Sequence, residues 1–174
     1  GGSYASHSVV DSRCVSLLPP KNVDLRDAAS IPVAGLTAYE SLVKIGLGST
    51  SNKTLKKDQG TMETAGLEST IAATTATNKD TKTLLVVGGA GGVGSWILTL
   101  ARTWHPNLQI MATASTEPQK EWCLSLGATQ VIQHDQVTSA LKGGREGSVD
   151  YIVCLAEPTL PLFAALSEVI KPYG

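Results

Sequence analysis

From residue 84 onward, short apolar runs alternate with longer segments whose apolar residues recur at helical spacing. The runs predict buried strands at residues 84–87, 108–114, 130–133 and 151–156. The segments between and after them predict helices through residues 96–104, 117–126 and 160–170, with Gly127 closing the second and Pro172 and Gly174 ending the third. Strands that alternate with helices are typical of an α/β fold with a parallel sheet covered on both faces.

The first half of the chain is patterned differently. Residues 1–24 alternate loosely and end at a Pro-Pro pair, which suits one or two short strands at the tail of another β-rich unit. Residues 25–47 form a connecting helix in this interpretation, with Asp27 near its start and Pro32 as a position where it could break. Residues 48–83 are rich in Thr, Ser, Lys and Asn, so we expect a mobile surface loop. Residues 84–174 then form an α/β domain that is incomplete at its C-terminus.

Composition narrows the range of partners. The chain has 174 residues, of which 42% are apolar and 17% charged, enough for one packed domain and a short piece of another. A net charge of −1 offers no basic excess for a nucleic acid or an anionic membrane, and no apolar stretch is long enough to span one. Three cysteines without zinc-ligand spacing indicate a reducing, cytoplasmic setting. The chain starts without Met and stops after a turn, so we expect a fragment.

A glycine cluster between the first predicted strand and the helix after it carries the chemistry. Gly89, Gly91 and Gly94 match GxGxxG in the strand–turn–helix context that a dinucleotide site requires. In that motif the first glycine allows the tight turn, the second admits the pyrophosphate, and the third lets the helix pack on the strand. The alternative is a ligand-free glycine turn. No Gly-Lys-Ser/Thr follows, which excludes a Walker loop.

The end of the second predicted strand bears on which dinucleotide binds. NAD sites usually place a carboxylate about 20 residues beyond the motif, and Ala114 stands there. Ser115, Thr116 and Lys120 follow and can donate to a ribose 2′-phosphate, which favours NADP(H) over NAD(H). Glu117 argues against this preference for NADP(H), because a small shift in strand register would bring its carboxylate to the ribose.

Further segments of the sequence resemble the medium-chain dehydrogenase/reductase superfamily, in its quinone-oxidoreductase and zinc-type alcohol-dehydrogenase-like branch. Residues 2–5 resemble the Gly-x-Tyr/Phe-Ala-Glu signature of its catalytic domain, and residues 28–39 resemble the helix that leads into its cofactor domain. The resemblance implies a Rossmann fold, here a truncated doubly wound parallel sheet with strand order 3-2-1-4. The polar loop at 48–83 is longer than the family's usual connection.

The resemblance also implies roles for individual residues. Thr37 matches a threonine beside the nicotinamide, although its hydroxyl could instead bond within its own helix. His134 matches a position beside the adenosine phosphate, with a half-exposed histidine at a strand end as the alternative. Leu155 and Ala156 match the backbone that passes the nicotinamide ribose. The implied cofactor-binding set is Gly89, Ala90, Gly91, Gly92, Val93, Gly94, Ser115, Thr116, Lys120, His134, Leu155 and Ala156.

Zinc is not expected. The zinc-dependent branch places a metal ligand four residues before the threonine equivalent to Thr37, where this chain has Val33. We therefore expect an NADPH-dependent, zinc-independent oxidoreductase that transfers hydride to a quinone, an enone or a similar electron-poor carbonyl compound. The alternatives are a zinc-type alcohol dehydrogenase using NAD(P) and a non-catalytic dinucleotide-binding protein. A small-molecule substrate and, at full length, a homodimer are the expected partners; no proton donor can be named, and the fragment alone should be inactive.

Overall fold

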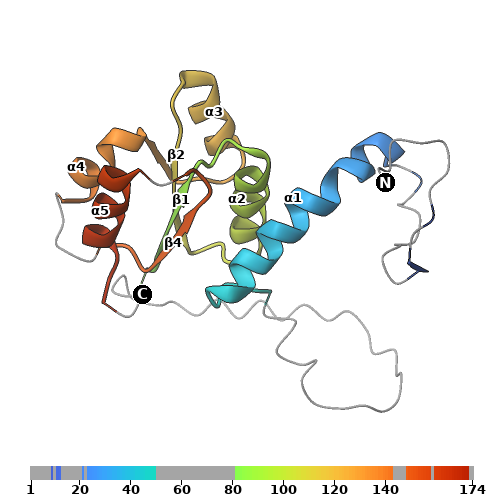
Figure 1. Cartoon of the computed structure of the whole chain (residues 1–174), viewed down its shortest axis with the longest axis horizontal. Coiled ribbons are helices and arrows are strands. Elements are labelled where there is room, and N and C mark those ends of the chain that lie inside the picture. Colours follow the sequence, from blue (N-terminus) through green and yellow to red (C-terminus); the bar gives the residue numbers. More distant parts are fainter. Residues whose placement is uncertain are drawn as a thin grey trace, which may run out of the picture. The chain divides into compact units, whose positions relative to one another are not determined.

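The computed structural model describes residues 9, 11–12, 21, 23–49, 81–142, 148–157 and 159–172 (Figure 1). The chain divides into two compact units, Gly1–Val33 and Ala34–Gly174. Most of the expected mobile loop at 48–83 lies outside the described residues, which include only 48–49 and 81–83 of it. Residues 2–5 also lie outside them. The glycine turn and the predicted sheet both belong to the second unit, which the following paragraphs describe.

The second unit is built on a four-stranded sheet. Its strands are β1 (Thr83–Val87), β2 (Gln109–Thr113), β3 (Gln130–Ile132) and β4 (Tyr151–Cys154). The order is β3-β2-β1-β4 and every pairing is parallel. Val86 of β1 lies opposite Ala112 of β2 on one side and Val153 of β4 on the other. The predicted fold class and strand order are therefore confirmed.

The helices are α1 (Leu25–Lys44), α2 (Gly92–Trp104), α3 (Glu117–Ser125), α4 (Val137–Lys142) and α5 (Leu160–Val169), with a 3₁₀ turn, η3 (His134–Gln136), before α4. Pro32 lies inside α1, which continues through it without a break. The sequence pattern did not predict η3 and α4. This segment is too short to show a helical period, because its buried apolar positions are Val137 and Leu141 alone.

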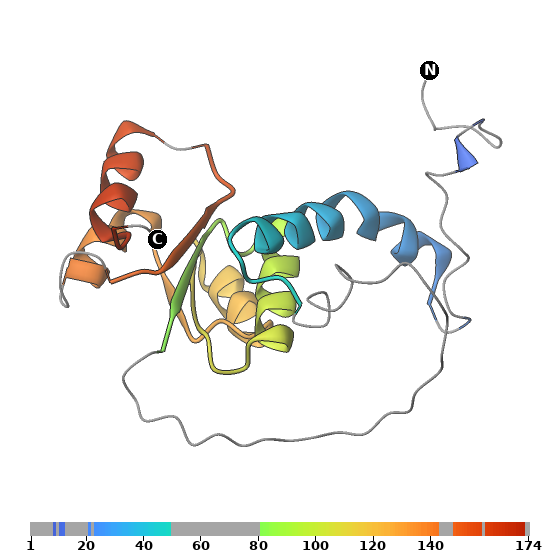
Figure 2. The same ribbon diagram turned by 90° about the horizontal axis from the view of Figure 1, so that it is seen from below.

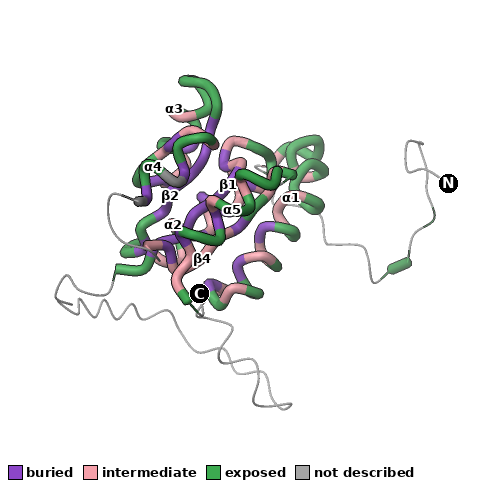
Figure 3. The backbone as a smooth tube through the Cα atoms, turned by 60° about the vertical axis from the view of Figure 1, so that its left-hand side comes forward, coloured by how far each residue is buried: buried purple, intermediate pink, exposed green. Residues whose placement is uncertain are grey.

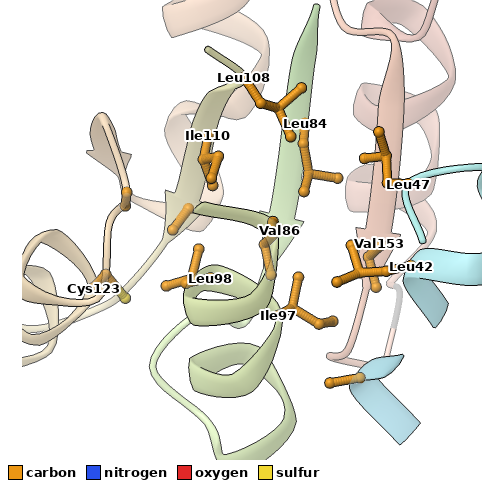
Figure 4. Packing of buried hydrophobic residues seen from close by; sticks show 14 of the residues in the cluster. Leu42, Leu47, Leu84, Val86, Ile97, Leu98, Leu108, Ile110, Cys123 and Val153 are labelled. Atoms are coloured by element: carbon orange, nitrogen blue, oxygen red, sulfur yellow. The ribbon is translucent and has the colours of Figure 1, made fainter. Parts of the chain in front are cut away.

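Two apolar clusters cover the two faces of the sheet. Alternate side chains of β1 point to opposite faces, so Leu84 and Val86 join one cluster while Leu85 and Val87 join the other. The first cluster includes residues of α2, α3 and the C-terminal turns of α1, and Figure 4 shows its packing around Val86 and Ile97. The second includes residues of α4 and α5, which Figure 2 shows on the side of the sheet opposite α2. Burial is accordingly complete along β1 and nearly complete along β2 (Figure 3).

Candidate functional site

The carboxyl ends of the four parallel strands bring most of the predicted site residues to one edge of the sheet. The glycine turn follows β1, Ser115 and Thr116 follow β2, His134 follows β3, and Leu155 and Ala156 follow β4. In open α/β sheets, ligands bind in the crevice outside this edge. The topology therefore assembles a candidate site from segments that lie far apart in the sequence.

The tight turn after β1 depends on a different glycine from the one predicted. Gly88 has φ +85, a conformation that L side chains rarely adopt, whereas Gly89 is not among the positive-φ glycines. Gly89 is needed for packing instead, because a Cβ there would lie 2.8 Å from the Cβ of Ala112 and 3.3 Å from Sγ of Cys123. Burial raises the pKa of the Cys123 thiol, so this cysteine acts as a packing group beneath the turn rather than as a nucleophile.

Gly94 packs as the motif predicts, and Gly91 leaves open space beside the turn. A Cβ on Gly94 would collide with the carbonyl oxygen of Gly88 and lie 2.6 Å from that of Gly89, so only glycine allows α2 to begin this close to the turn. Gly91 is exposed, and a Cβ there would meet only the carbonyl oxygen of Gly88, at 3.5 Å. Gly91 is also the N-cap of α2, whose first turn contains no acidic residue. This geometry suits a pyrophosphate, since the helix N-terminus offers free N–H groups and a positive dipole end.

Thr113, the last residue of β2, holds the turn and was missed by the sequence interpretation. Its side chain is fully buried. The N–H of Gly88 donates to Thr113 Oγ1 over 2.9 Å, and the N–H of Gly89 donates to the Thr113 carbonyl over 3.2 Å. Thr113 Oγ1 also lies 3.1 Å from Nε2 of His134. In the sequence, Thr113 is only a hydroxyl residue near the end of the predicted strand 108–114, which does not indicate these contacts.

The ends of β3 and β4 form one wall of the site. The N–H of Leu155 donates to the carbonyl of Val87 over 3.0 Å. Gly88 lies against Leu155 and the backbone N of Ala156, since a Cβ on Gly88 would be 3.6 and 3.7 Å from them. His134 and Ala156 then line a common cleft of about 550 Å³. The other lining residues are Asp135, Glu157, Thr159, Pro161, Leu162 and Ala165. Of these, none was singled out from the sequence.

The residues expected to bind a 2′-phosphate already have partners on α3. Nζ of Lys120 lies 2.5 Å from Oε1 of Glu117, an ion pair within the first turn of α3. The side-chain amide oxygen of Gln119 accepts the N–H groups of Ser115 and Thr116, at 3.1 and 3.3 Å. A phosphate at this position would therefore compete with Glu117 for the ammonium group of Lys120.

Ala114 is not exposed at the carboxyl edge of the sheet. It is 2% exposed and belongs to the core cluster shared with α2, and its N–H donates to the carbonyl of Ile132. The first exposed position after β2 is Ser115. The side chain that could meet the ribose is thus Ser115, one residue later than the spacing of the motif indicated.

Two further contacts connect helices to the turn region. A Cβ on Gly92 would lie 3.8 Å from the Cβ of Ala34, which places α1 beside the start of α2, and Thr37 follows Ala34 by three residues on the same helix. The indole N–H of Trp122 on α3 donates to Ser95 Oγ on α2 over 2.9 Å. The structure thus brings the segment that contains Thr37 near the glycine turn.

Within the described ranges, no group of three or more His, Cys, Asp or Glu side chains is placed to hold a metal ion. No helix in the same part of the chain is long and apolar enough to cross a membrane.

Among curated relatives, a zinc-type alcohol dehydrogenase-like protein of Staphylococcus aureus is 30% identical over 174 residues. That alignment covers 99% of this chain and 44% of the relative, so the chain spans less than half the length of the curated relatives it matches. The NADPH-dependent alkenal/one oxidoreductase of Arabidopsis thaliana chloroplasts is 34% identical over 133 residues, or 76% of this chain and 26% of the relative. No protein-family model matches the chain.

Solved structures agree with this relationship. A Rhizobium etli protein named for zinc-dependent alcohol dehydrogenases superposes with a TM-score of 0.62 at 26% identity, over 89% of this chain and 38% of the other. The quinone oxidoreductase of Thermus thermophilus, also solved with NADPH, superposes with a TM-score of 0.53 at 20% identity, over 86% and 38%. The second match supports the fold alone.

The sheet order, the glycine turn and the crevice at the carboxyl edge define a Rossmann-type α/β domain. With the relatives above, the chain belongs to the medium-chain dehydrogenase/reductase superfamily, in the branch of the zinc-type alcohol-dehydrogenase-like proteins and quinone oxidoreductases.

Proposed function

We propose that this protein binds NADPH at the carboxyl edge of the sheet and that the full-length protein is a zinc-independent oxidoreductase. Its substrate would be a quinone, an enone or a similar electron-poor carbonyl compound. The observation that carries the proposal is the glycine turn, which excludes a Cβ at Gly94 while leaving Gly91 exposed. Together these two features present the N-terminus of α2 to a pyrophosphate at close range.

The residues of this chain would bind and orient the cofactor. Backbone N–H groups at the start of α2 receive the pyrophosphate, and the cleft lined by His134 and Ala156 accommodates part of the dinucleotide. Leu155 and Ala156 lie against Gly88 and direct the nicotinamide end toward the substrate. The reduced nicotinamide, when bound, supplies the hydride, and the protein supplies orientation and exclusion of water.

The preference for NADPH rests on charge. After β2 the first exposed positions are Ser115 and Thr116, which carry no charge to repel a 2′-phosphate. Lys120 lies one turn into α3 and can exchange Glu117 for a phosphate, which carries nearly two negative charges and is the stronger partner. The name of the Arabidopsis relative, which includes NADPH and an alkenal/one substrate, points the same way.

A zinc-type alcohol dehydrogenase is the second candidate, and the name of the Staphylococcus relative favours it. Against it, Val33 offers no ligand atom four residues before Thr37. Elemental analysis of the full-length protein separates the two. About one tightly held zinc ion per subunit, required for turnover, would replace the zinc-free proposal with the zinc-dependent one.

The central test is Gly91→Val. The φ of −73 at Gly91 suits any residue, so the variant should fold, while its branched side chain would occupy the pyrophosphate position. Calorimetry on the purified protein should show NADPH binding with a lower NADH affinity in wild type, and a loss of at least about 100-fold for the variant. Thr103→Val, near the far end of α2, is the control for effects on the helix alone.

Two results would contradict the proposal. If Gly91→Val binds NADPH as tightly as wild type, the glycine turn is not the dinucleotide site. If wild type binds NADH more tightly than NADPH, the assignment of Ser115, Thr116 and Lys120 to a phosphate is wrong, and Glu117 becomes the ribose ligand.

A further inference from the structure

The side chain of Thr113 makes two hydrogen bonds in a place that water does not reach. Its exposed fraction is 0%, its Oγ1 accepts the N–H of Gly88 over 2.9 Å, and the same oxygen lies 3.1 Å from Nε2 of His134. The Thr113 carbonyl also accepts the N–H of Gly89 over 3.2 Å. The first two residues of the glycine turn are thus both held by this one threonine.

The hydrogen count of the threonine hydroxyl decides the state of the histidine. A hydroxyl has one hydrogen to donate and two lone pairs that accept. Because the Gly88 N–H already donates to Oγ1, the hydroxyl hydrogen is directed to the remaining partner, Nε2 of His134. If Nε2 carried a hydrogen instead, the Thr113 hydroxyl hydrogen would have no acceptor at a fully buried position.

We propose that Thr113 and His134 form a positioning pair for the glycine turn, in which neutral His134 accepts through Nε2 and carries its hydrogen on Nδ1. The pair fixes the direction of the Thr113 lone pair that receives the Gly88 N–H. It thereby sets the turn from which α2 presents its N–H groups. This inference rests on the proposed function, because it makes the hydrogen-bonded pair a determinant of dinucleotide affinity.

The position of His134 distinguishes this pair from an ordinary buried contact. His134 is half-buried, begins η3 and lines the same cleft as Ala156, while Gly88 packs against Leu155 and Ala156. One uninterrupted path of hydrogen bonds therefore runs from the cleft wall to the glycine turn. A βα turn that binds no ligand does not need hydrogen bonds that connect it to a cleft.

The affinity test uses four variants of the purified protein and NADPH. Thr113→Val keeps the shape of the side chain but leaves the Gly88 N–H without its acceptor, so we expect affinity to fall about tenfold or more. Thr113→Ser keeps the hydroxyl and should restore affinity to within about threefold of wild type. His134→Ala should weaken binding less than Thr113→Val does, because the bond to Gly88 survives.

The double variant Thr113→Val/His134→Ala gives the decisive comparison. If His134 acts through the Thr113 hydroxyl, the double variant should bind no more weakly than Thr113→Val alone. If the two losses multiply instead, His134 acts on the ligand directly, and the positioning pair is refuted. Wild-type affinity in Thr113→Val, or failure of Thr113→Ser to restore binding, would also overturn it.

A spectroscopic measurement keeps the inference testable if a variant does not fold or if the dinucleotide does not bind. ¹⁵N chemical shifts of the imidazole in ligand-free wild type, recorded at about pH 8, separate the two neutral tautomers. The Nδ1–H tautomer is expected for His134, and the Nε2–H tautomer would overturn the pair. If neither NADPH nor NADH binds but His134 is the Nδ1–H tautomer, the proposed function and the role of the pair in affinity are refuted. The hydrogen-bond assignment of Thr113 and His134 is then still correct.

Discussion

The two edges of the sheet are held together by different chemistry. At the amino edge, before β1 and β4, charged side chains make the connections. At the carboxyl edge, after β1 and β2, backbone groups, the Thr113 hydroxyl and the His134 ring make the buried connections, and the ion pair that lies nearby, Glu117–Lys120, is on the surface of α3. The charges at the amino edge stabilise the fold, whereas those of the Glu117–Lys120 pair at the carboxyl edge remain available to a ligand.

Asp150 is the centre of the amino edge. Its side chain is 17% exposed; one oxygen accepts from Lys171 Nζ over 2.7 Å and the other from the Thr83 N–H over 2.8 Å. Burial raises the pKa of Asp150, but the two hydrogen bonds and the charges of Lys171 and Lys82 outweigh burial and lower it overall. At the same edge, the hydrogen bond from Lys82 to Tyr151 raises the pKa of that lysine. Each oxygen of the Asp150 carboxylate accepts a hydrogen bond from within the chain, so this carboxylate stabilises the fold at the amino edge.

At the carboxyl edge the Glu117–Lys120 ion pair is exposed to solvent. The Glu117 side chain is 77% exposed and that of Lys120 24%, and the two are three residues apart on one helix. Such a pair contributes at most about 1 kcal/mol, so a ligand phosphate can replace Glu117 at little cost to the fold. The hydrogen bonds from the glycine turn to Thr113 involve no carboxylate, so they place no fixed negative charge beside the proposed pyrophosphate site.

The largest effect should come from breaking the carboxyl edge at Gly94. In Gly94→Ala the new Cβ would overlap backbone oxygen atoms of Gly88 and Gly89, which cannot rotate away. We expect the free energy of unfolding to fall by about 2–3 kcal/mol or more, as for other overpacked sites, measured by urea denaturation.

The control for Gly94→Ala is Gly92→Ala, where the new Cβ would lie at an ordinary 3.8 Å from the Cβ of Ala34. Its stability should stay within about 1 kcal/mol of wild type. Equal stability of Gly94→Ala and wild type would mean that α2 can move away from the turn, and the close packing described above would be wrong.

The amino edge should respond to pH. Asp150→Asn removes the charge that pairs with Lys171 while leaving an acceptor for the Thr83 N–H, so we expect a loss of about 1–2 kcal/mol at pH 7. Because folding lowers the pKa of Asp150, its contribution is present above the unfolded-state pKa and is lost as the pH falls through the lower folded-state value.

The difference between Asp150→Asn and wild type should therefore shrink as the pH falls below the ordinary aspartate pKa of about 3.9, measured by denaturation at pH 7 and at pH 3. Glu121→Gln, at an exposed position on α3, is the control for loss of a carboxylate as such. A difference that is the same at pH 7 and pH 3 would show that the Asp150 charge does not stabilise this edge.

The smallest and most discriminating effect concerns the open ion pair. Glu117→Gln frees Lys120, so NADPH affinity should rise about two- to fivefold, in the range of a surface ion pair, and NADH affinity should hardly change. Lys120→Ala should weaken NADPH binding without affecting NADH. Calorimetry with both cofactors measures this. A fall in NADH affinity for Glu117→Gln would instead identify Glu117 as a ribose ligand.

Much of the fold followed from local pattern. Each strand of the sheet is short and nearly all apolar, and Gly127, which ends the turn after α3, has φ +107. The strand order was implied by the family resemblance and its Rossmann fold rather than by the local pattern. The segment of η3 and α4 escaped prediction because six residues of helix carry too few apolar positions to show a period.

The site was only partly predictable for a related reason. The GxGxxG motif specified that a turn would meet a helix here, but which glycine adopts positive φ depends on the path of the chain, and Gly88 rather than Gly89 does so. Ala114 was predicted to face the ribose from its spacing, yet it is 2% exposed and belongs to the core cluster. Such assignments change with a shift of one residue, because side chains alternate between faces along a strand.

By itself, the sequence determined the alternation of strands and helices, the parallel sheet and the position of the glycine turn, because these depend on local periodicity and on backbone freedom at glycine. The tertiary structure alone decided that Thr113 reaches both Gly88 and His134, residues 25 positions before it and 21 after it. It also paired Asp150 with Thr83 from 67 residues away. Hydrogen bonds between such distant residues depend on strand register and packing, and no local pattern in the chain encodes them.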